Sequence, residues 1–254
     1  MASIFIGFKQ RMAYRADWIL TIFAALTSIL IQMALWKYLY AADTDKINYM
    51  TGYVIYVGIL NSIYTNRIYH ILAGKILNGD FVLDLIKPVN IVWFSYLKSL
   101  GESLAQTVLQ TFPLIIIFSP IILKVTIWNN FGLYLGALFL GHILFSTIYA
   151  IIGFTAFIFV DVWALRRLAE DTIKIMSGAL LPIALFPESL KKIVFIFPFH
   201  YLYDFPLQIL LNLEMDVSAI RFNFINAILW EIVLLVLLCL IYKIATYFCV
   251  VQGG

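Results

Sequence analysis

Long apolar runs separated by short polar stretches make up almost the whole chain. Because a run of about 20 apolar residues is needed to cross a bilayer as a helix, this pattern predicts five plain membrane spans and one interrupted segment. The plain spans are expected at about residues 18–36, 51–66, 103–123, 131–160 and 222–242, and the third can also begin at Trp93. The sequence therefore predicts an all-α membrane protein with six transmembrane helices.

The interrupted segment begins with an apolar run at 173–185, which at about thirteen residues is too short to cross as a helix. Pro187, Pro198 and Pro206 then punctuate two short apolar pieces rich in aromatic residues. Non-helical backbone survives at membrane depth only where it is packed in protein or lines a cavity. The pattern predicts a fifth span followed by a re-entrant helical hairpin at 187–211, with Pro187 and Pro198 as gate candidates.

The N-terminal residues 1–16 place apolar side chains at helical spacing, with lysine and arginine between them. This pattern is typical of an amphipathic helix that lies on the membrane surface. With the N-terminus inside, about eleven lysines and arginines fall on the inner side and about six on the outer side, as the positive-inside rule requires. We therefore expect both termini in the cytoplasm and the hairpin at 187–211 on the outer face.

Composition limits what else the chain can hold. Hydrophobic residues make up 63% and charged residues 12% of the 254 positions, whereas soluble domains carry about a quarter charged residues. Six spans and their loops use this length, so a single transmembrane domain covering 1–254 is expected, without a soluble catalytic domain. The three histidines are scattered and lack neighbouring ligands at metal-site spacing. No metal site is predicted.

The loop between the second and third spans contains a short amphipathic helix, expected within residues 77–88. Gly79 can end one helical turn, Asp80 can cap the next, and Pro88 ends the helix. Its polar stripe consists of Asp80, Asp84 and Lys87. A helix in this position can lie across the membrane surface and present one face to a soluble partner.

The order of these elements resembles the permease subunits of type-2 ABC exporters. That family has an inner amphipathic helix, two spans, a short coupling helix, two long spans, and a fifth span followed by outward re-entrant helices. At the coupling position this chain has Gly79-Asp80…Leu83…Leu85…Pro88. At the re-entrant position it has Gly178-Ala-Leu-Leu-Pro182…Phe186-Pro187…Pro198-Phe-His-Tyr201…Pro206. The resemblance covers nearly the whole chain and is closest to a subgroup whose permeases are encoded separately.

The resemblance implies a dimer with a second permease, identical or homologous, in a prokaryotic plasma membrane, driven by two copies of a separate ABC ATPase subunit. ATP and Mg would bind to that ATPase, and this chain would be non-catalytic and bind no cofactor or nucleic acid. The chain agrees, since it lacks the phosphate-binding pattern G-x-x-x-x-G-K-[ST]. The residues expected at the ATPase contact are Asp80, Phe81, Leu83, Asp84 and Lys87. The charged stretch 161–171 is either a second contact or plain interfacial charge.

Two sets of polar residues lie within the predicted spans. Glu102, Gln106 and Gln110 recur every fourth residue and so share one helix face, with Lys98 as a candidate partner of Glu102. The stripe either lines a substrate route or hydrogen-bonds a neighbouring helix. Glu231 lies deep in the sixth span, where an ionisable group is costly. It has a role in transport or gating, or it makes an interhelical hydrogen bond to a group such as Asn61 or His142.

These features predict an exporter permease. Its cargo is expected to be amphipathic (a drug, peptide or lipid), because the walls are apolar and aromatic and no charged pocket is evident. One alternative is an intramembrane lipid-modifying enzyme, which would need carboxylates or histidines clustered at one depth. Another is an ATP-independent transporter or channel. Transporters of inverted repeats tend to show paired broken helices, whereas here only the second half is interrupted.

Overall fold

The computed structural model describes residues 2–13, 15–65, 67–86, 90–159, 162–211 and 215–248, and these contain helices and turns without a strand. Four stretches are long and apolar enough to cross a membrane: Trp18–Leu39, Ile91–Val125, Trp128–Phe157 and Val217–Tyr247. The described chain is therefore an all-helical protein with four candidate spans. The six spans expected from sequence include two further segments that are shorter or more polar.

The α-helices, in chain order, are α1 (Ala2–Ala13), α2 (Arg15–Leu39), α3 (Thr44–Ile63), α4 (Arg67–Leu77), α5 (Asp80–Leu85), α6 (Ile91–Gln106), α7 (Phe112–Val125), α8 (Phe131–Phe154), α9 (Trp163–Met176), α10 (Glu188–Ile196), α11 (Asp204–Leu211) and α12 (Val217–Phe248). Short turns of other helix types are η1 (Thr107–Thr111, π), and the 3-10 turns η2 (Trp128–Asn130), η3 (Thr155–Phe157), η4 (Ile183–Leu185) and η5 (Pro198–Tyr201).

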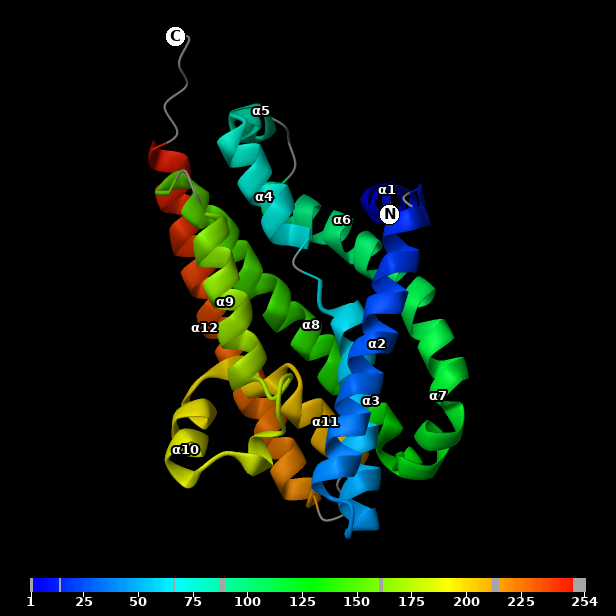
Figure 1. Ribbon diagram of the computed structural model, residues 1–254. Coiled ribbons are helices and arrows are strands. Elements are labelled where there is room, and N and C mark those ends of the chain that lie inside the picture. The colour runs from blue at the N-terminus through cyan, green and yellow to red at the C-terminus, as the bar shows by residue number, and fades with distance from the viewer. Residues whose placement is uncertain are drawn as a thin grey trace.

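The long helices form one bundle with two distinct ends (Figure 1). One end, called the α5 end, contains α1, α5 and the last turns of α12 (Figure 1). The opposite end, called the α10 end, contains α10 and the connection from α2 to α3 (Figure 1). α1 packs along α6. Their contact depends on two glycines, because a Cβ at Gly7 would strike the carbonyl of Lys98 and a Cβ at Gly101 would strike the carbonyl of Ile4.

α3 is the central helix of the bundle, in contact with α2, α7, α6 and α11. Twelve of its twenty residues are buried. It starts at Thr44, earlier than the predicted span at 51–66, because Asp43 caps it by accepting a hydrogen bond from the Lys46 amide (3.0 Å). Its polar first turns keep it outside the four candidate spans.

The third span is continuous from α6 through η1 to α7. It therefore starts at Ile91, close to the second of the two predicted starts, Trp93, and not at residue 103. The π turn ends at Thr111, two residues before Pro113. A proline in a helix lacks the amide hydrogen and crowds the carbonyl four residues before it, and a wider π turn relieves this conflict. Hydroxyl groups tie the turn to α3, with Ser62 against Thr111 at 2.6 Å.

The predicted fifth segment breaks earlier than expected. α9 ends at Met176, so most of the apolar run 173–185 is not α-helical. Gly178 ends the helix with a φ of +86°, a conformation that favours glycine. The break is held in the bundle because the Tyr53 hydroxyl donates to the Gly178 carbonyl (2.8 Å) and the Asp204 amide donates to the Ser177 carbonyl (3.0 Å). The predicted hairpin at 187–211 comprises α10, η5 and α11.

The remaining spans differ from prediction at their ends. α8 stops at Phe154 and continues as the single turn η3, short of the predicted residue 160. α12 runs from Val217 to Phe248, beyond the predicted 222–242 at both ends. Its outer turns are more polar than its middle, which is why hydropathy alone underestimates its length.

Candidate functional site

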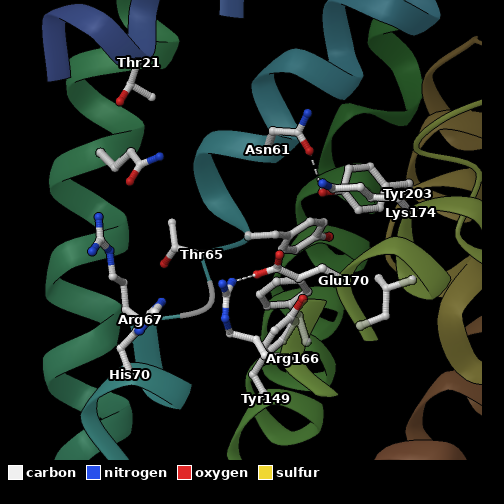
Figure 2. A pocket seen from close by; sticks show the side chains of 14 residues that line it. Thr21, Asn61, Thr65, Arg67, His70, Tyr149, Arg166, Glu170, Lys174 and Tyr203 are labelled. Atoms are coloured by element: carbon white, nitrogen blue, oxygen red, sulfur yellow. Dashed lines mark hydrogen bonds and ion pairs between the residues drawn. The ribbon is translucent and has the colours of Figure 1, made fainter. Parts of the chain in front are cut away.

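A polar cavity of about 480 Å³ lies within the bundle, on the α5 side of the break after α9. Its walls come from α2, α3, α4, α6, α8 and α9, together with the segment before α11. The residues that line it are Thr21, Asn61, Tyr64, Thr65, Arg67, His70, Gln106, Phe145, Tyr149, Arg166, Glu170, Ile173, Lys174 and Tyr203. Figure 2 shows these side chains converging from helices far apart in the sequence.

Three contacts fix the polar walls of the cavity. The Tyr203 hydroxyl donates to Asn61 Oδ1 (2.7 Å), and Arg166 forms an ion pair with Glu170 one turn later on α9 (Figure 2). Arg67 Nε lies 3.5 Å from Glu102 Oε2. The first contact joins α3 to the segment before α11, the second lies within α9, and the third joins α4 to α6.

The cavity carries an excess of positive charge. Arg67, Arg166 and Lys174 line it, against the single carboxylate Glu170. Partial desolvation of its ring, followed by the guanidinium charges of Arg166 and Arg67, holds the pKa of His70 below its usual value. The neutral form of His70 is therefore favoured. The arginines and the lysine, which outnumber the lining carboxylate, make the cavity suited to an anion.

The predicted polar stripe on the third span is divided between two environments. Gln106 lines the cavity, whereas Gln110 is buried and accepts a hydrogen bond from Gln106 (3.4 Å). Glu102 forms its ion pair with Arg67 of α4, a partner that the sequence did not indicate. The stripe therefore contributes both to the cavity wall and to contacts between helices.

Glu231 lies away from this cavity, between α12 and α8. It is only 6% exposed, and its Oε1 accepts a hydrogen bond from Thr147 Oγ1 at 2.7 Å. The expected partners were different: Asn61 instead accepts from Tyr203, and His142 lies near Ser146 (3.5 Å). The interaction observed for Glu231 is an interhelical hydrogen bond.

The predicted coupling helix is α5, which is six residues long. Gly79 has a φ of +78° and separates α4 from α5, as expected, but Asp80 lies in the first turn and does not cap the helix. Phe81 was expected at the ATPase contact, yet it is 1% exposed. It lies edge-on against Phe154, Phe157 and Tyr242, with centroid distances of 6.0, 5.1 and 6.5 Å. Phe81 therefore anchors α5 to the bundle.

The other predicted contact residues of α5 have varied surroundings. Asp84 is paired with Lys75 of α4. Asp80 is exposed, Leu83 is 58% exposed, and Ile86, just after the helix, is 78% exposed. Lys87, with the predicted end of the helix at Pro88, lies outside the described residues. An apolar surface is therefore available on the side of α5 opposite Phe81.

The two gate candidates lie in the segment after the break. Pro187 precedes α10, and its carbonyl accepts hydrogen bonds from the Leu190 and Lys191 amides (2.9 and 3.0 Å). Pro198 begins η5 and is buried. Neither proline lines the polar cavity. Pro198 is therefore part of the packed structure, whereas Pro187 is exposed at the start of α10.

Sequence reasoning missed most of the cavity, although part of the signal was present. Arg166, Glu170 and Lys174 recur every fourth residue, which places them on one face of a helix. The sequence left residues 161–171 as either a second ATPase contact or interfacial charge, and neither interpretation places these side chains in a cavity. The other half of the cavity, from α3 and α4, is about 100 residues away in sequence, and no local pattern indicates the juxtaposition.

The described residues contain no group of three or more His, Cys, Asp or Glu side chains placed to hold a metal ion. A family model described as ABC-2 family transporter protein matches residues 26–253, nearly the whole chain. The comparison with curated proteins finds no match.

Proposed function

The chain belongs to the ABC-2 transporter family, and from this premise we propose that it is the membrane permease subunit of an exporter whose ATPase is a separate polypeptide. Members of this family are typically non-catalytic membrane subunits and generally act with an ATPase partner. The observation that carries the proposal is the position of α5, a short helix anchored by Phe81 and exposed on its other side. ATP and Mg would bind on the partner.

The proposed topology has six crossings. α3 supplies the second crossing, since it is twenty residues long and is shielded from lipid by its neighbours. The fifth crossing is made by α9 together with the broken segment up to α11, which packs against α3 and α8. The α5 end is cytoplasmic, with both termini, and α10 to α11 form the outer hairpin. The distribution of lysine and arginine supports this orientation.

The proposed ATPase contact is the exposed side of α5. Asp80, Leu83 and Ile86 are available to a soluble partner, while Phe81 passes movement of α5 to the ends of α8 and α12 through its ring contacts. α4 carries the same movement toward the cavity, because Arg67 and His70 line it. Hydrolysis in the partner would in this way change the walls of the cavity.

The proposed path for cargo includes the polar cavity and continues between this chain and a second permease, identical or homologous. The first and last candidate spans bury only 11% and 17% of their most apolar windows. These helices therefore have wide apolar surfaces for lipid and for the second permease. An amphipathic cargo fits a route that has a polar cavity within an apolar bundle.

The proposal is tested by purifying the tagged full chain from its native membrane and measuring ATP hydrolysis in the eluate. An ATPase should co-purify with the wild-type chain. Leu83→Glu should abolish both the recovery of the ATPase and the ATP hydrolysis in the eluate, because a charge would lie in the apolar contact. Lys192→Glu, a charge change on exposed α10, is the matched control and should retain both. Full export by vesicles containing this chain without any ATPase would refute the proposal.

A further inference from the structure

The polar cavity has a charge pattern that points to the chemical class of the cargo. Of its cations, Arg166 is paired with Glu170, and Arg67 is paired with Glu102. Among the described residues, no ion pair with the Lys174 ammonium is found. Lys174 therefore supplies a positive charge that the described protein does not neutralise.

Lys174 lies at membrane depth in the proposed topology. Gly178, four residues later, is bonded to Tyr53, which is the tenth residue of the twenty-residue helix α3. The end of α9 is therefore level with the middle of α3, and Lys174 is about one helical turn, or ~6 Å, toward the α5 end. An ammonium at this depth is costly unless it faces a water-filled cavity or a counter-charge. Lys174 is exposed and lines the cavity.

The rest of the lining can complete an anion site. Gln106 has a second amide hydrogen besides the one that it donates to Gln110, and this hydrogen can be donated to an oxygen anion. The hydroxyls of Thr21 and Thr65 also line the cavity, and that of Thr65 is bonded to Ser103. Arginine guanidinium groups suit phosphate and carboxylate geometry. The volume of about 480 Å³ is within the range of small-molecule sites and exceeds the volume that a bare oxyanion needs.

Apolar surface lies next to the cavity. Leu20 and Phe23 flank Thr21 on α2, and both are exposed. Phe145 and Ile173 add apolar surface inside the cavity. Apolar surface inside the cavity and on neighbouring α2 suits the hydrocarbon part of an amphipath.

We propose that this cavity binds the anionic group, phosphate or carboxylate, of an amphipathic cargo, with Lys174 as the principal counter-charge. The inference rests on the proposed export function and adds the class of cargo. Binding by the full chain alone, in nanodiscs of zwitterionic lipid, tests it without an ATPase. A failure of binding is thus distinguishable from a failure of the export proposal, which depends on ATPase recovery.

The experiment measures fluorescence anisotropy of two probes with the same chain and fluorophore, a lysophosphatidic acid and a neutral monoacylglycerol. Wild type should bind the anionic probe at least about tenfold more tightly. Lys174→Gln should weaken that binding by about tenfold to a hundredfold, the range for losing a hydrogen bond to a charged group. Glu170→Gln should tighten it, because Arg166 is released. Equal binding of the two probes would overturn the inference.

Controls separate the site from the fold and from other anion sources. Lys174→Arg should retain binding, and Lys192→Gln, on exposed α10, should match wild type. A loss in Lys174→Gln no larger than in Lys192→Gln would show that the anion binds elsewhere and overturn the proposal. Inorganic phosphate should displace the probe far less effectively than unlabelled lysophosphatidic acid. Equal displacement would identify a site for free phosphate and overturn the assignment to an amphipath.

Discussion

Replacing Phe81 by alanine is expected to release α5 from the bundle while the long helices keep their packing. Phe81 is the buried residue of this six-residue helix, and its ring lies against three other rings from the ends of α8, η3 and α12. The Lys75 ammonium of α4 adds an ion pair to the Asp84 carboxylate of α5. The stability of the docked position therefore depends mainly on a single side chain.

The magnitude follows from these contacts. Truncating a buried phenylalanine to alanine typically costs about 3–5 kcal/mol, and each edge-on ring pair accounts for about 0.5–1.5 kcal/mol of interaction. The ion pair between Lys75 and Asp84 adds to this, but the burial of Phe81 is the larger apolar contribution. A loss of about 3 kcal/mol raises the population of the undocked state by about a hundredfold.

Hydrogen–deuterium exchange of the full chain in nanodiscs measures this directly. Amides of α5 in Phe81→Ala should exchange about a hundredfold faster than in wild type, whereas amides in the middle of α8 should be unchanged. Leu83→Ala is the matched control, because Leu83 is on the same helix but 58% exposed. Exchange of α5 that is equally fast in the two variants would refute the anchoring role of Phe81.

Three further predictions concern other contacts. Gly101→Ala should separate α1 from α6, because the new Cβ meets backbone, and increased proteolysis of α1 would reveal it. Thr147→Val should lower thermal stability by about 1–3 kcal/mol by stranding a carboxylate oxygen, whereas Glu231→Gln can still accept the bond; equal stability of the two variants would contradict this view. Arg166→Gln should raise the pKa of His70, because it removes a neighbouring positive charge; an unchanged NMR titration of the labelled histidine would contradict the field inferred in the cavity.

The spans were predictable because long apolar runs dominate hydropathy. The runs around α2, α8 and α12 locate those helices within a few residues, and the prolines after 185 indicate a segment that is not a simple helix. Their ends were less predictable, since polar residues extend α12 beyond its apolar middle. The irregular turn before Pro113 could also have been predicted, because a proline inside a span disturbs the preceding helical turn.

The cavity was not predictable from any one segment. Its charge depends on α4 and α9 both contributing to the lining, and on Lys174 lying in the last turn of α9, just before the break at Gly178. The expectation of an apolar, uncharged interior failed because charged residues near span ends were assigned to the membrane surface. The role of Phe81 was missed for a related reason: an amphipathic pattern on a six-residue helix does not show which apolar residue faces the bundle.

The central position of α3 has a consequence for how this protein enters the membrane. The first turns of α3 contain the polar residues Asp45, Lys46 and Asn48. The free energy of moving the isolated segment from the translocation machinery into lipid is therefore only weakly favourable. Its partners α7 and α11 are synthesised later, and they provide the burial that α3 needs. We expect stable insertion of α3 to wait for these helices, so biogenesis of the chain would be cooperative, with truncations before α11 degraded by quality control.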